Sequence, residues 1–240
     1  ATHYGAAINA LSPFTYTDCN FTENKANGGT GIIHYMGTTY DNVFTEDSAI
    51  SGCKFDENTA NYYTVYFYGT KSLSVSDSEF NKNNVGYSTI LFMAKNLTVS
   101  NTKFEENTAG KYGGGIYFQG ENLVVSESNF TKNTAGIYGG AILVNGANSV
   151  ATITDSSFVQ NGVPVYGGAI FSSGKLTVTG STFEDNTGGA KFFNIYHGSD
   201  ITLTNNIFKT IKADNVSIAV EEDTYPYGSV IPVTGTFDWG

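Results

Sequence analysis

The sequence predicts an all-β fold, a right-handed parallel β-helix with three strands per turn and roughly eight turns. Three observations predict it. A Phe-x-x-Asn motif returns at near-constant intervals, apolar columns align on each Phe with spacings of two, and glycine doublets introduce a further apolar strand after the Asn. A helical period is missing from the 240 residues, which excludes a βαβ architecture.

The Phe-x-x-Asn motif marks each turn of the coil. Successive Phe residues are separated by 34, 25, 24, 26, 28, 25 and 25 positions. We expect the Phe rings to stack inside the coil, and each Asn to bond the backbone of its own turn and the amide one turn away. The motifs begin at Phe21, Phe55, Phe80, Phe104, Phe130, Phe158 and Phe183, and Phe208 continues the series without the Asn.

Each repeat contains two strands before the Asn and one after it. The first strand has a Leu-x-Val pattern, as at Leu97 and Val99, and the second has a Ser-x-Phe pattern, as at Ser128 and Phe130. Residues two apart lie on the same side of a strand, so both patterns describe an inward face. The third strand follows glycines, as in Gly113-Gly-Gly-Ile116, because glycine allows the sharp corner that the coil needs.

Composition excludes several classes of function. The net charge is −10, and all 12 basic residues are Lys. This charge disfavours nucleic acid as a partner, and the lack of Arg removes the usual bidentate binder of phosphate. An apolar run long enough to span a membrane is missing from this fragment. We also expect no metal and no cofactor, because the sequence has no calcium-binding nonapeptide, zinc spacing or phosphate loop. The sequence leaves the oligomeric state open.

The two cysteines fall in one column. Cys19 and Cys53 stand two positions before the Phe of consecutive repeats, where other repeats have Ser or Thr. Stacked strands bring their Cα atoms within disulfide range, but parallel Cβ directions do not suit a bridge. We therefore favour two unbridged, buried thiols over a disulfide.

The Phe-x-x-Asn motif together with Gly-Gly-Ala-Ile resembles the repeats of chlamydial polymorphic outer-membrane proteins. It is more completely similar to adhesin-like surface proteins of methanogenic archaea, which join right-handed β-helix repeats to immunoglobulin-like domains. The resemblance covers about residues 1–212 and is specific for the fold but weakly specific for function. It implies an extracellular, cell-surface, non-catalytic adhesin fragment that attaches to a glycan or protein on another cell.

The two ends of the chain suggest a piece of a longer protein. Tyr4-Gly-Ala-Ala-Ile8 matches Tyr166-Gly-Gly-Ala-Ile170, so the chain begins inside a third strand. Residues 213–240 leave the repeat and look like a linker and the first strands of a truncated immunoglobulin-like module in such adhesins. The alternative is that this segment caps the last turn of the domain at 1–212.

An enzyme is the main alternative function, since many β-helix proteins cleave polysaccharides. Lyases that resemble pectate lyase use calcium-binding carboxylates and a basic residue, typically Arg, and this chain has no Arg. Polygalacturonase-like enzymes need clustered Asp residues and a His, and the three histidines here are scattered. Glu127 and Asp155 on adjacent turns resemble a glycosidase pair, but their column lies at a turn, where Asp and Asn are favoured. We therefore expect no catalytic residues. A polysaccharide lyase, a glycoside hydrolase and a purely structural stalk stay open as alternatives.

The outward side of the third strand carries the candidate binding surface. Apolar and aromatic residues recur one position after the inward Ile column, and one such stripe on a soluble monomer suggests a contact surface, either for protein or as an aromatic platform for sugars. A covering segment or a register shifted by one residue would explain the same pattern. The candidate stripe contains His34, Tyr66, Tyr68, Leu91, Tyr117, Leu143 and Phe171.

Two further candidates lie outside the stripe. The interval of 34 residues contains an insertion, from Thr38 to about Asp47, whose Tyr40 and Phe44 form a candidate binding loop. Four Asn-x-Ser/Thr sequons mark possible glycosylation sites. These sequons begin at Asn20, Asn96, Asn129 and Asn215.

Overall fold

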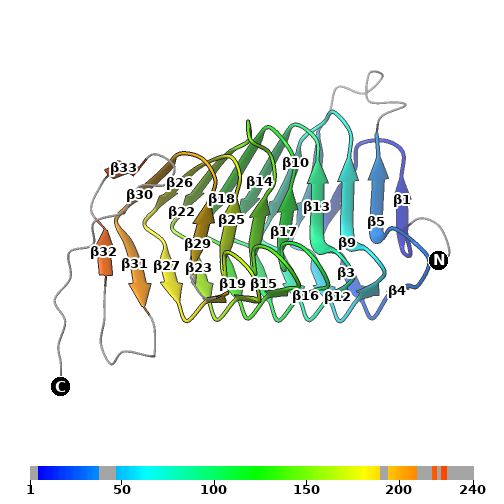
Figure 1. Cartoon of the computed structure of the whole chain (residues 1–240). Coiled ribbons are helices and arrows are strands. Elements are labelled where there is room, and N and C mark those ends of the chain that lie inside the picture. Colours follow the sequence, from blue (N-terminus) through cyan, green and yellow to red (C-terminus); the bar gives the residue numbers. More distant parts are fainter. Residues whose placement is uncertain (1–4, 38–46, 190–193, 210–217, 221–222, 226–240) are drawn as a thin grey trace.

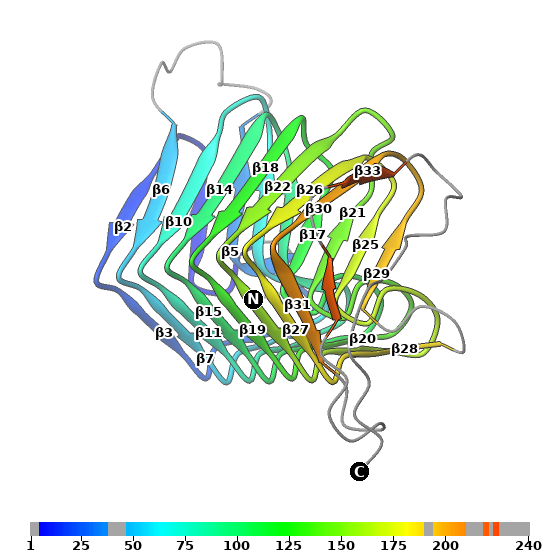
Figure 2. The ribbon, with the colours of Figure 1, turned by 90° about the vertical axis from the view of Figure 1, so that its left-hand side faces the viewer.

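The computed structural model describes residues 5–37, 47–189, 194–209, 218–220 and 223–225. These residues form a right-handed coil of about eight turns, built from strands without any helix in the described ranges. The strands lie side by side along the coil in Figure 1, and Figure 2 views the coil obliquely from the end that carries β31. The predicted fold class is therefore confirmed.

The coil has four sheets rather than the three strands per turn that the sequence suggested. We name the four sheets A to D, and in each turn the chain passes through sheets B, C, D and A in that order. Sheet D is the missed one: its strands are only two residues long and directly follow the Asn, too short to show a period of two. Its strands are β4 (Lys25–Ala26), β8 (Thr59–Ala60), β12 (Asn84–Val85), β16 (Thr108–Ala109), β20 (Thr134–Ala135), β24 (Gly162–Val163) and β28 (Thr187–Gly188).

Sheet C carries the Phe of each repeat on its inward face. Phe80 and Phe104 pair in register, with ring centroids 4.9 Å apart and planes within 5°. Stacked rings therefore repeat at the spacing of the strands. The strands are β3 (Asn20–Thr22), β7 (Lys54–Asp56), β11 (Glu79–Asn81), β15 (Lys103–Glu105), β19 (Asn129–Thr131), β23 (Ser157–Val159), β27 (Thr182–Glu184), β31 (Asn206–Lys209) and β32 (Ile218–Val220).

Sheet B contains the Leu-x-Val strands, whose Leu and Val face the core. Leu97 and Val99 are fully buried, whereas Thr98 between them is exposed. The strands are β2 (Thr15–Thr17), β6 (Ser48–Ser51), β10 (Leu73–Ser76), β14 (Asn96–Ser100), β18 (Asn122–Ser126), β22 (Val150–Thr154), β26 (Lys175–Thr179), β30 (Ile201–Thr204) and β33 (Asp223–Tyr225).

Sheet A follows the glycines and buries an Ile or Val column. A second stack of aromatic rings lies two residues further on, formed by Tyr35, Phe67, Phe92 and Phe118. The strands are β1 (Ile8–Ala10), β5 (Gly31–Met36), β9 (Tyr63–Tyr68), β13 (Ser88–Met93), β17 (Ile116–Phe118), β21 (Ile142–Val144), β25 (Ile170–Ser172) and β29 (Ile195–His197).

The Asn column holds the corner between sheets C and D. Asn107 donates through Nδ2 to Asn133 Oδ1 at 2.9 Å and to the carbonyl oxygen of Phe80 at 2.7 Å. Its own Oδ1 accepts the Asn83 backbone N–H at 3.0 Å. The amide contact between turns was predicted, but the backbone contacts go to the preceding turn rather than to its own. Buried amides bonded in this way cost little and fix the register of every turn.

The two cysteines are unbridged in the structure. Cys53 is buried and Cys19 is half-buried, and the Cys19 backbone N–H lies 3.4 Å from Cys53 Sγ. In the next turn the Cys53 backbone N–H donates to Ser78 Oγ at 3.1 Å. The thiols therefore occupy a hydrogen-bonded column of small polar side chains. They are unbridged as predicted, whereas the predicted burial holds for Cys53 and not for Cys19.

The described part of the tail adds to the last turn of the coil. Strand β33 pairs antiparallel with β30, and β32 pairs antiparallel with β31, whereas the pairs within the coil are parallel. Both strands thus lie on the end edges of sheets B and C (Figure 2). The immunoglobulin-like assignment of residues 213–240 stays a prediction.

Candidate functional site

The outward side of sheet A places the predicted stripe in one register column. Strand pairing aligns Asn9, His34, Tyr66, Leu91, Tyr117, Leu143, Phe171 and Tyr196. The register inferred from the repeats was therefore right for His34 through Phe171, and the column extends to Tyr196. Tyr68 pairs with Met93 in a separate column two residues further along.

The stripe is less exposed than the sequence suggested. His34, Leu91 and Leu143 each keep only 2% of their surface accessible, so the prediction of an exposed stripe is wrong at these three positions. Tyr66 and Tyr117 are half-buried. A second row of tyrosines contacts the aromatic members of the central column.

The second row stands at the corner between sheets D and A, where backbone bridges join its members from turn to turn. Tyr112 contacts Tyr117 with ring centroids 5.2 Å apart, and Tyr138 contacts Phe171 at 4.7 Å. We call this row and the central column together the aromatic face. The row contains Tyr62, Tyr87, Tyr112, Tyr138 and Tyr166.

Sequence reasoning missed this row because its spacing changes along the chain. Tyr62 and Tyr87 stand three positions before the inward residue of sheet A, whereas Tyr112, Tyr138 and Tyr166 stand four before it. In the later turns a glycine with positive φ takes up the extra residue, such as Gly139 at φ 62°. The signal available was the recurrent Tyr-Gly-Gly, which reads as a corner rather than as part of a surface.

The rings of the outer row stack mainly on one another. Tyr112 and Tyr138 have centroids 6.3 Å apart and planes within 10°, and Tyr138 and Tyr166 are arranged alike at 6.2 Å and 9°. At the amino-terminal end of the row the rings tilt, and the ring planes of Tyr87 and Tyr112 differ by 62°. Rings stacked along the axis leave chiefly their edges and hydroxyl groups for a partner. The face is therefore amphipathic, with apolar edges beside a series of phenol hydroxyls.

Burial affects the tyrosines on the strands of sheet A. Desolvation raises the pKa of Tyr63, Tyr66 and Tyr117 above the usual value of tyrosine. The Tyr117 hydroxyl accepts a hydrogen bond from Asn145 Nδ2 at 3.1 Å, and Lys111 Nζ donates to the Tyr87 hydroxyl at 2.9 Å. That bond to Tyr87 also raises the pKa of Lys111. The hydroxyl of a phenol can both donate and accept hydrogen bonds.

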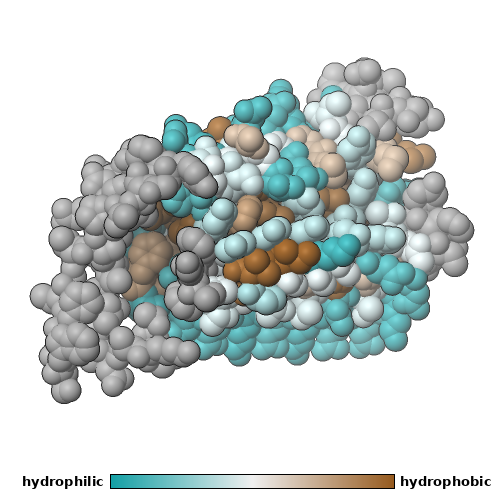
Figure 3. All heavy atoms as spheres, viewed as in Figure 1, coloured by the Kyte–Doolittle hydropathy of each residue, from teal (hydrophilic) through white to brown (hydrophobic). Residues whose placement is uncertain are grey.

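Figure 3 views this side of the molecule and shows hydrophobic residues gathered over its middle, with hydrophilic residues around them.

His34 lies toward the amino-terminal end of the face. Its ring stacks on Tyr66 at 4.9 Å, and its Nδ1 lies 2.8 Å from Asn9 Oδ1. Burial lowers the pKa of His34. The central column therefore carries no formal charge near neutral pH in the described turns.

A cleft of about 430 Å³ opens beside the aromatic face, where sheet A turns into sheet B. Its lining comes from three successive corners. The lining residues are Tyr68, Gly69, Thr70, Met93, Ala94, Lys95, Gln119 and Glu121. The cleft meets the aromatic face at Tyr68, whose ring centroid lies 6.4 Å from that of Tyr66. We call it the corner cleft. No recurring motif in the sequence predicts the corner cleft, because the cleft depends on how three corners of unequal sequence fit together.

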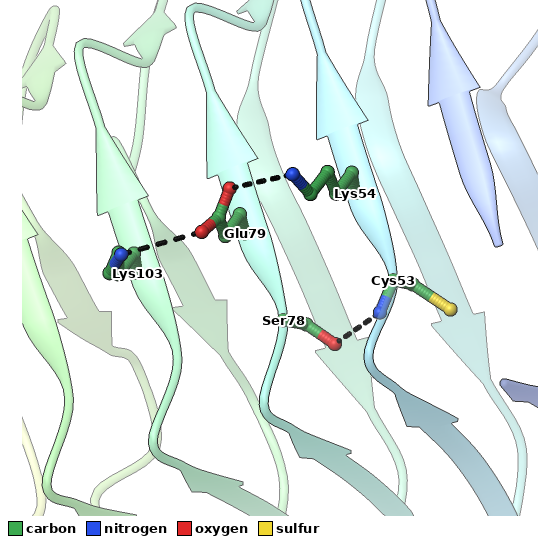
Figure 4. A network of polar contacts seen from close by, with 5 residues as sticks. All are labelled: Cys53, Lys54, Ser78, Glu79 and Lys103. Atoms are coloured by element: carbon green, nitrogen blue, oxygen red, sulfur yellow. Dashed lines mark hydrogen bonds and ion pairs between the residues drawn. The ribbon is translucent and has the colours of Figure 1, made fainter. Parts of the chain in front are cut away.

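Sheet C presents a different outer surface. Glu79 lies between two lysines, with Lys103 Nζ at 3.4 Å and Lys54 Nζ at 3.8 Å (Figure 4). Neighbouring corners carry single ion pairs, since Glu57 pairs with Lys82 at 3.7 Å and Glu106 with Lys132 at 3.5 Å. These charges are solvated and paired across turns, and we call this surface the charged face.

The carboxylates considered for catalysis occupy strained turns between sheets B and C. Glu127 has φ 49° and Asp155 has φ 48°, and Asp18, Asp77 and Asn101 in the same column are also left-handed. Short polar side chains tolerate this conformation best, which accounts for the recurrence of Asp and Asn there. Among the described residues there is no group of three His, Cys, Asp or Glu side chains placed to hold a metal ion.

The remaining candidate residues fall into two groups. Asn20 and Asn129 are exposed, and Asn96 is half-buried, so three sequons lie at the surface. Asn129 Oδ1 accepts a hydrogen bond from Ser157 Oγ at 2.7 Å. Tyr40, Phe44 and Asn215 lie outside the described residues. Across the described ranges no helix is both long and apolar enough to cross a membrane.

Comparison with known proteins gives one match. The family described as right handed beta helix region matches residues 42–208, which is more than half of the chain. No curated protein and no solved structure matches the sequence.

Proposed function

The chain belongs to the right-handed β-helix family, and from that premise we propose that it is a non-catalytic, extracellular binding module of a cell surface. It attaches through its aromatic face to glycans displayed by another cell. Since the fold serves enzymes and non-enzymes alike, the proposal rests on the surface of this chain rather than on the family.

The aromatic face is the observation that carries the proposal. Its tyrosines form a continuous amphipathic surface, and Tyr62 and Tyr166 keep 42% and 39% of their surface exposed. A monomer seldom exposes such a run of aromatic residues without a partner. Sugars offer apolar C–H groups beside hydroxyls, which match the ring edges and phenol hydroxyls of this face.

Charge narrows the class of glycan. The chain has a net charge of −10, the central column of the face adds no cation, and Lys111 beside Tyr87 supplies only one. Acidic polymers are therefore repelled at long range. We expect neutral glycans to bind and polyuronates or phosphorylated polymers to bind weakly.

A glycan array tests the proposal directly. The double variant Tyr112→Phe/Tyr138→Phe removes two hydroxyls but keeps both rings, and Tyr112→Ala/Tyr138→Ala removes the rings as well. We expect binding to fall at least severalfold in the first variant and about tenfold or more in the second, since each lost hydrogen bond or stacking contact contributes on the order of 1 kcal/mol.

The control variant is Lys54→Ala/Lys103→Ala on the charged face, which should bind like the wild type. Circular dichroism and thermal melting confirm that each variant is folded. Equal glycan binding by all variants would refute the aromatic face as the contact surface. Turnover of pectin or other wall polymers, measured as new reducing ends or unsaturated products, would refute the non-catalytic assignment.

A further inference from the structure

We propose that the corner cleft is the specificity subsite for one neutral pyranose residue at the end of a glycan. This inference rests on the proposed function and says where the most selective contact with the glycan lies. The aromatic face offers similar edges from turn to turn, so it cannot by itself distinguish one sugar from another. Selectivity requires a place where the turns differ.

The corner between sheets A and B is such a place. The turns between sheets B and C all pass through one left-handed residue, as do those between sheets C and D. The corner from A to B varies instead: residues 68–72 connect Phe67 to Leu73, whereas residues 93–96 connect Phe92 to Leu97. The side chains at this corner are thus free of the constraint that keeps the Phe and Asn columns uniform.

The backbone around the cleft is fixed. Gly69 N–H donates to the Met93 carbonyl oxygen at 3.2 Å, Gln119 N–H to that of Phe92 at 2.8 Å, and Glu121 N–H to that of Lys95 at 2.9 Å. Each of these bonds joins one corner to the next. The lining side chains therefore project from a preformed backbone frame, so that little free energy is lost in ordering the backbone when a ligand binds.

The lining has the chemistry that a pyranose needs. Tyr68 and Met93 supply apolar surface for the C–H face of the ring, and both are half-buried. Gln119 supplies an amide that donates and accepts, Lys95 an ammonium that only donates, and Glu121 a carboxylate that only accepts. A pair of neighbouring sugar hydroxyls requires both kinds of partner at once.

Size and charge favour a neutral sugar over other ligands. A volume of about 430 Å³ lies at the small end of the range for ligand sites, large enough for one sugar ring rather than a folded peptide. Lys95 and Glu121 balance each other, so neither an anion nor a cation gains net attraction. Because Tyr68 borders both surfaces, the rest of the glycan can continue onto the aromatic face.

Ligand-observed NMR with simple methyl glycosides tests the inference without a polymer. The probes are the methyl glycosides of glucose, galactose, mannose and N-acetylglucosamine, with methyl glucuronide as the acidic comparison. We expect one neutral glycoside to bind at millimolar concentration. Gln119→Ala and Tyr68→Ala should each weaken it about tenfold, and Glu121→Gln severalfold.

Matched controls come from the same residue types elsewhere. Gln160→Ala lies at an exposed corner between sheets C and D, and Tyr166→Ala lies in the outer row of the aromatic face. Neither should change binding of the single sugar, although Tyr166→Ala should weaken a longer glycan. Lys95→Ala and Glu121→Gln alter exposed side chains, so they report on the cleft even if Tyr68→Ala fails to fold.

The outcomes separate this inference from the proposed function. If a glycoside binds and all cleft variants bind it unchanged, or if methyl glucuronide binds best, the subsite is refuted while glycan binding stands. If arrays detect glycans through the aromatic face but no single glycoside binds, the subsite is again refuted. If neither arrays nor glycosides give any signal, the proposed function itself is refuted.

Discussion

The aromatic face and the charged face are both outer surfaces of parallel sheets in the same coil, with the same spacing between strands. On the charged face, Lys103, Glu79 and Lys54 form a row of exposed ion pairs. On the aromatic face the central column is uncharged, and Leu91 and Leu143 within it are as buried as core residues. The fold dictates only the inward columns. The outward side chains differ from sheet to sheet, and those of sheet A suit contact with a partner rather than solvation.

The largest expected effect comes from placing a charge on the aromatic face. Leu143 is 2% exposed and pairs in register with Tyr117 and Phe171. Leu143→Asp should lower the free energy of unfolding by about 3 kcal/mol, because a carboxylate at this buried position loses its hydration. Urea unfolding measures the loss.

The matched change on the charged face is Asn129→Asp, at an exposed position of β19. It should alter stability by less than about 0.5 kcal/mol. Similar losses from the two substitutions would show that the two faces do not differ in burial as the structure indicates.

A smaller effect should follow from acid. Burial lowers the pKa of His34, so the folded state resists protonation while the unfolded chain takes up a proton near its usual pKa of about 6.5. The stability that the neutral ring provides is thus fully present above that pH and is lost as the pH falls below it. Melting temperatures between pH 7.5 and 5 measure this, in a window above the usual titration of carboxylates.

The variant His34→Tyr keeps an aromatic ring beside Tyr66 but removes the titrating group. It should lose less stability between pH 7 and 5 than the wild type. The wild-type pH dependence would have another origin if the variant showed an unchanged slope.

The smallest effect is expected on the charged face itself. Glu79→Gln removes the ion pairs with Lys54 and Lys103, whose side chains are 60% and 58% exposed. Because solvent screens such pairs, the cost should stay below about 1 kcal/mol and should vanish in about 1 M salt. A larger loss that persists in salt would show that the pairs act through packing.

The inward columns could be read from the sequence, and the outer surfaces only in part. Phe104 and Asn107 recur at fixed positions because every turn must fill the same core and close the same corner. The central column from His34 to Phe171 followed from that register, but its burial did not. Tyr138 contacts Phe171 of that column, and the distance of the outer tyrosines from the inward residue changes where Gly139 lengthens the corner.

The corner cleft escaped prediction for a related physical reason. It forms where Tyr68, Met93 and Gln119 come together from three corners, and no single repeat contains it. The two-residue strands of sheet D were missed because a period of two cannot be recognised in Thr-Ala alone. Alternation and recurrence therefore report on what all turns share, whereas a site depends on what distinguishes one turn from the next.

The Asn column also gives the coil an electrical direction. Each side-chain amide donates one N–H to the amide oxygen of the next turn and its other N–H to a carbonyl of the preceding turn, while its own oxygen faces the preceding turn. The bonds between amides run in one direction along Asn58, Asn83, Asn107, Asn133, Asn161 and Asn186. Amides bonded head to tail polarise one another, and their dipoles add instead of cancelling. The carboxyl-terminal end of the column is therefore the positive pole and the amino-terminal end the negative one. The two ends of a coil that repeats almost uniformly are thus electrostatically unlike.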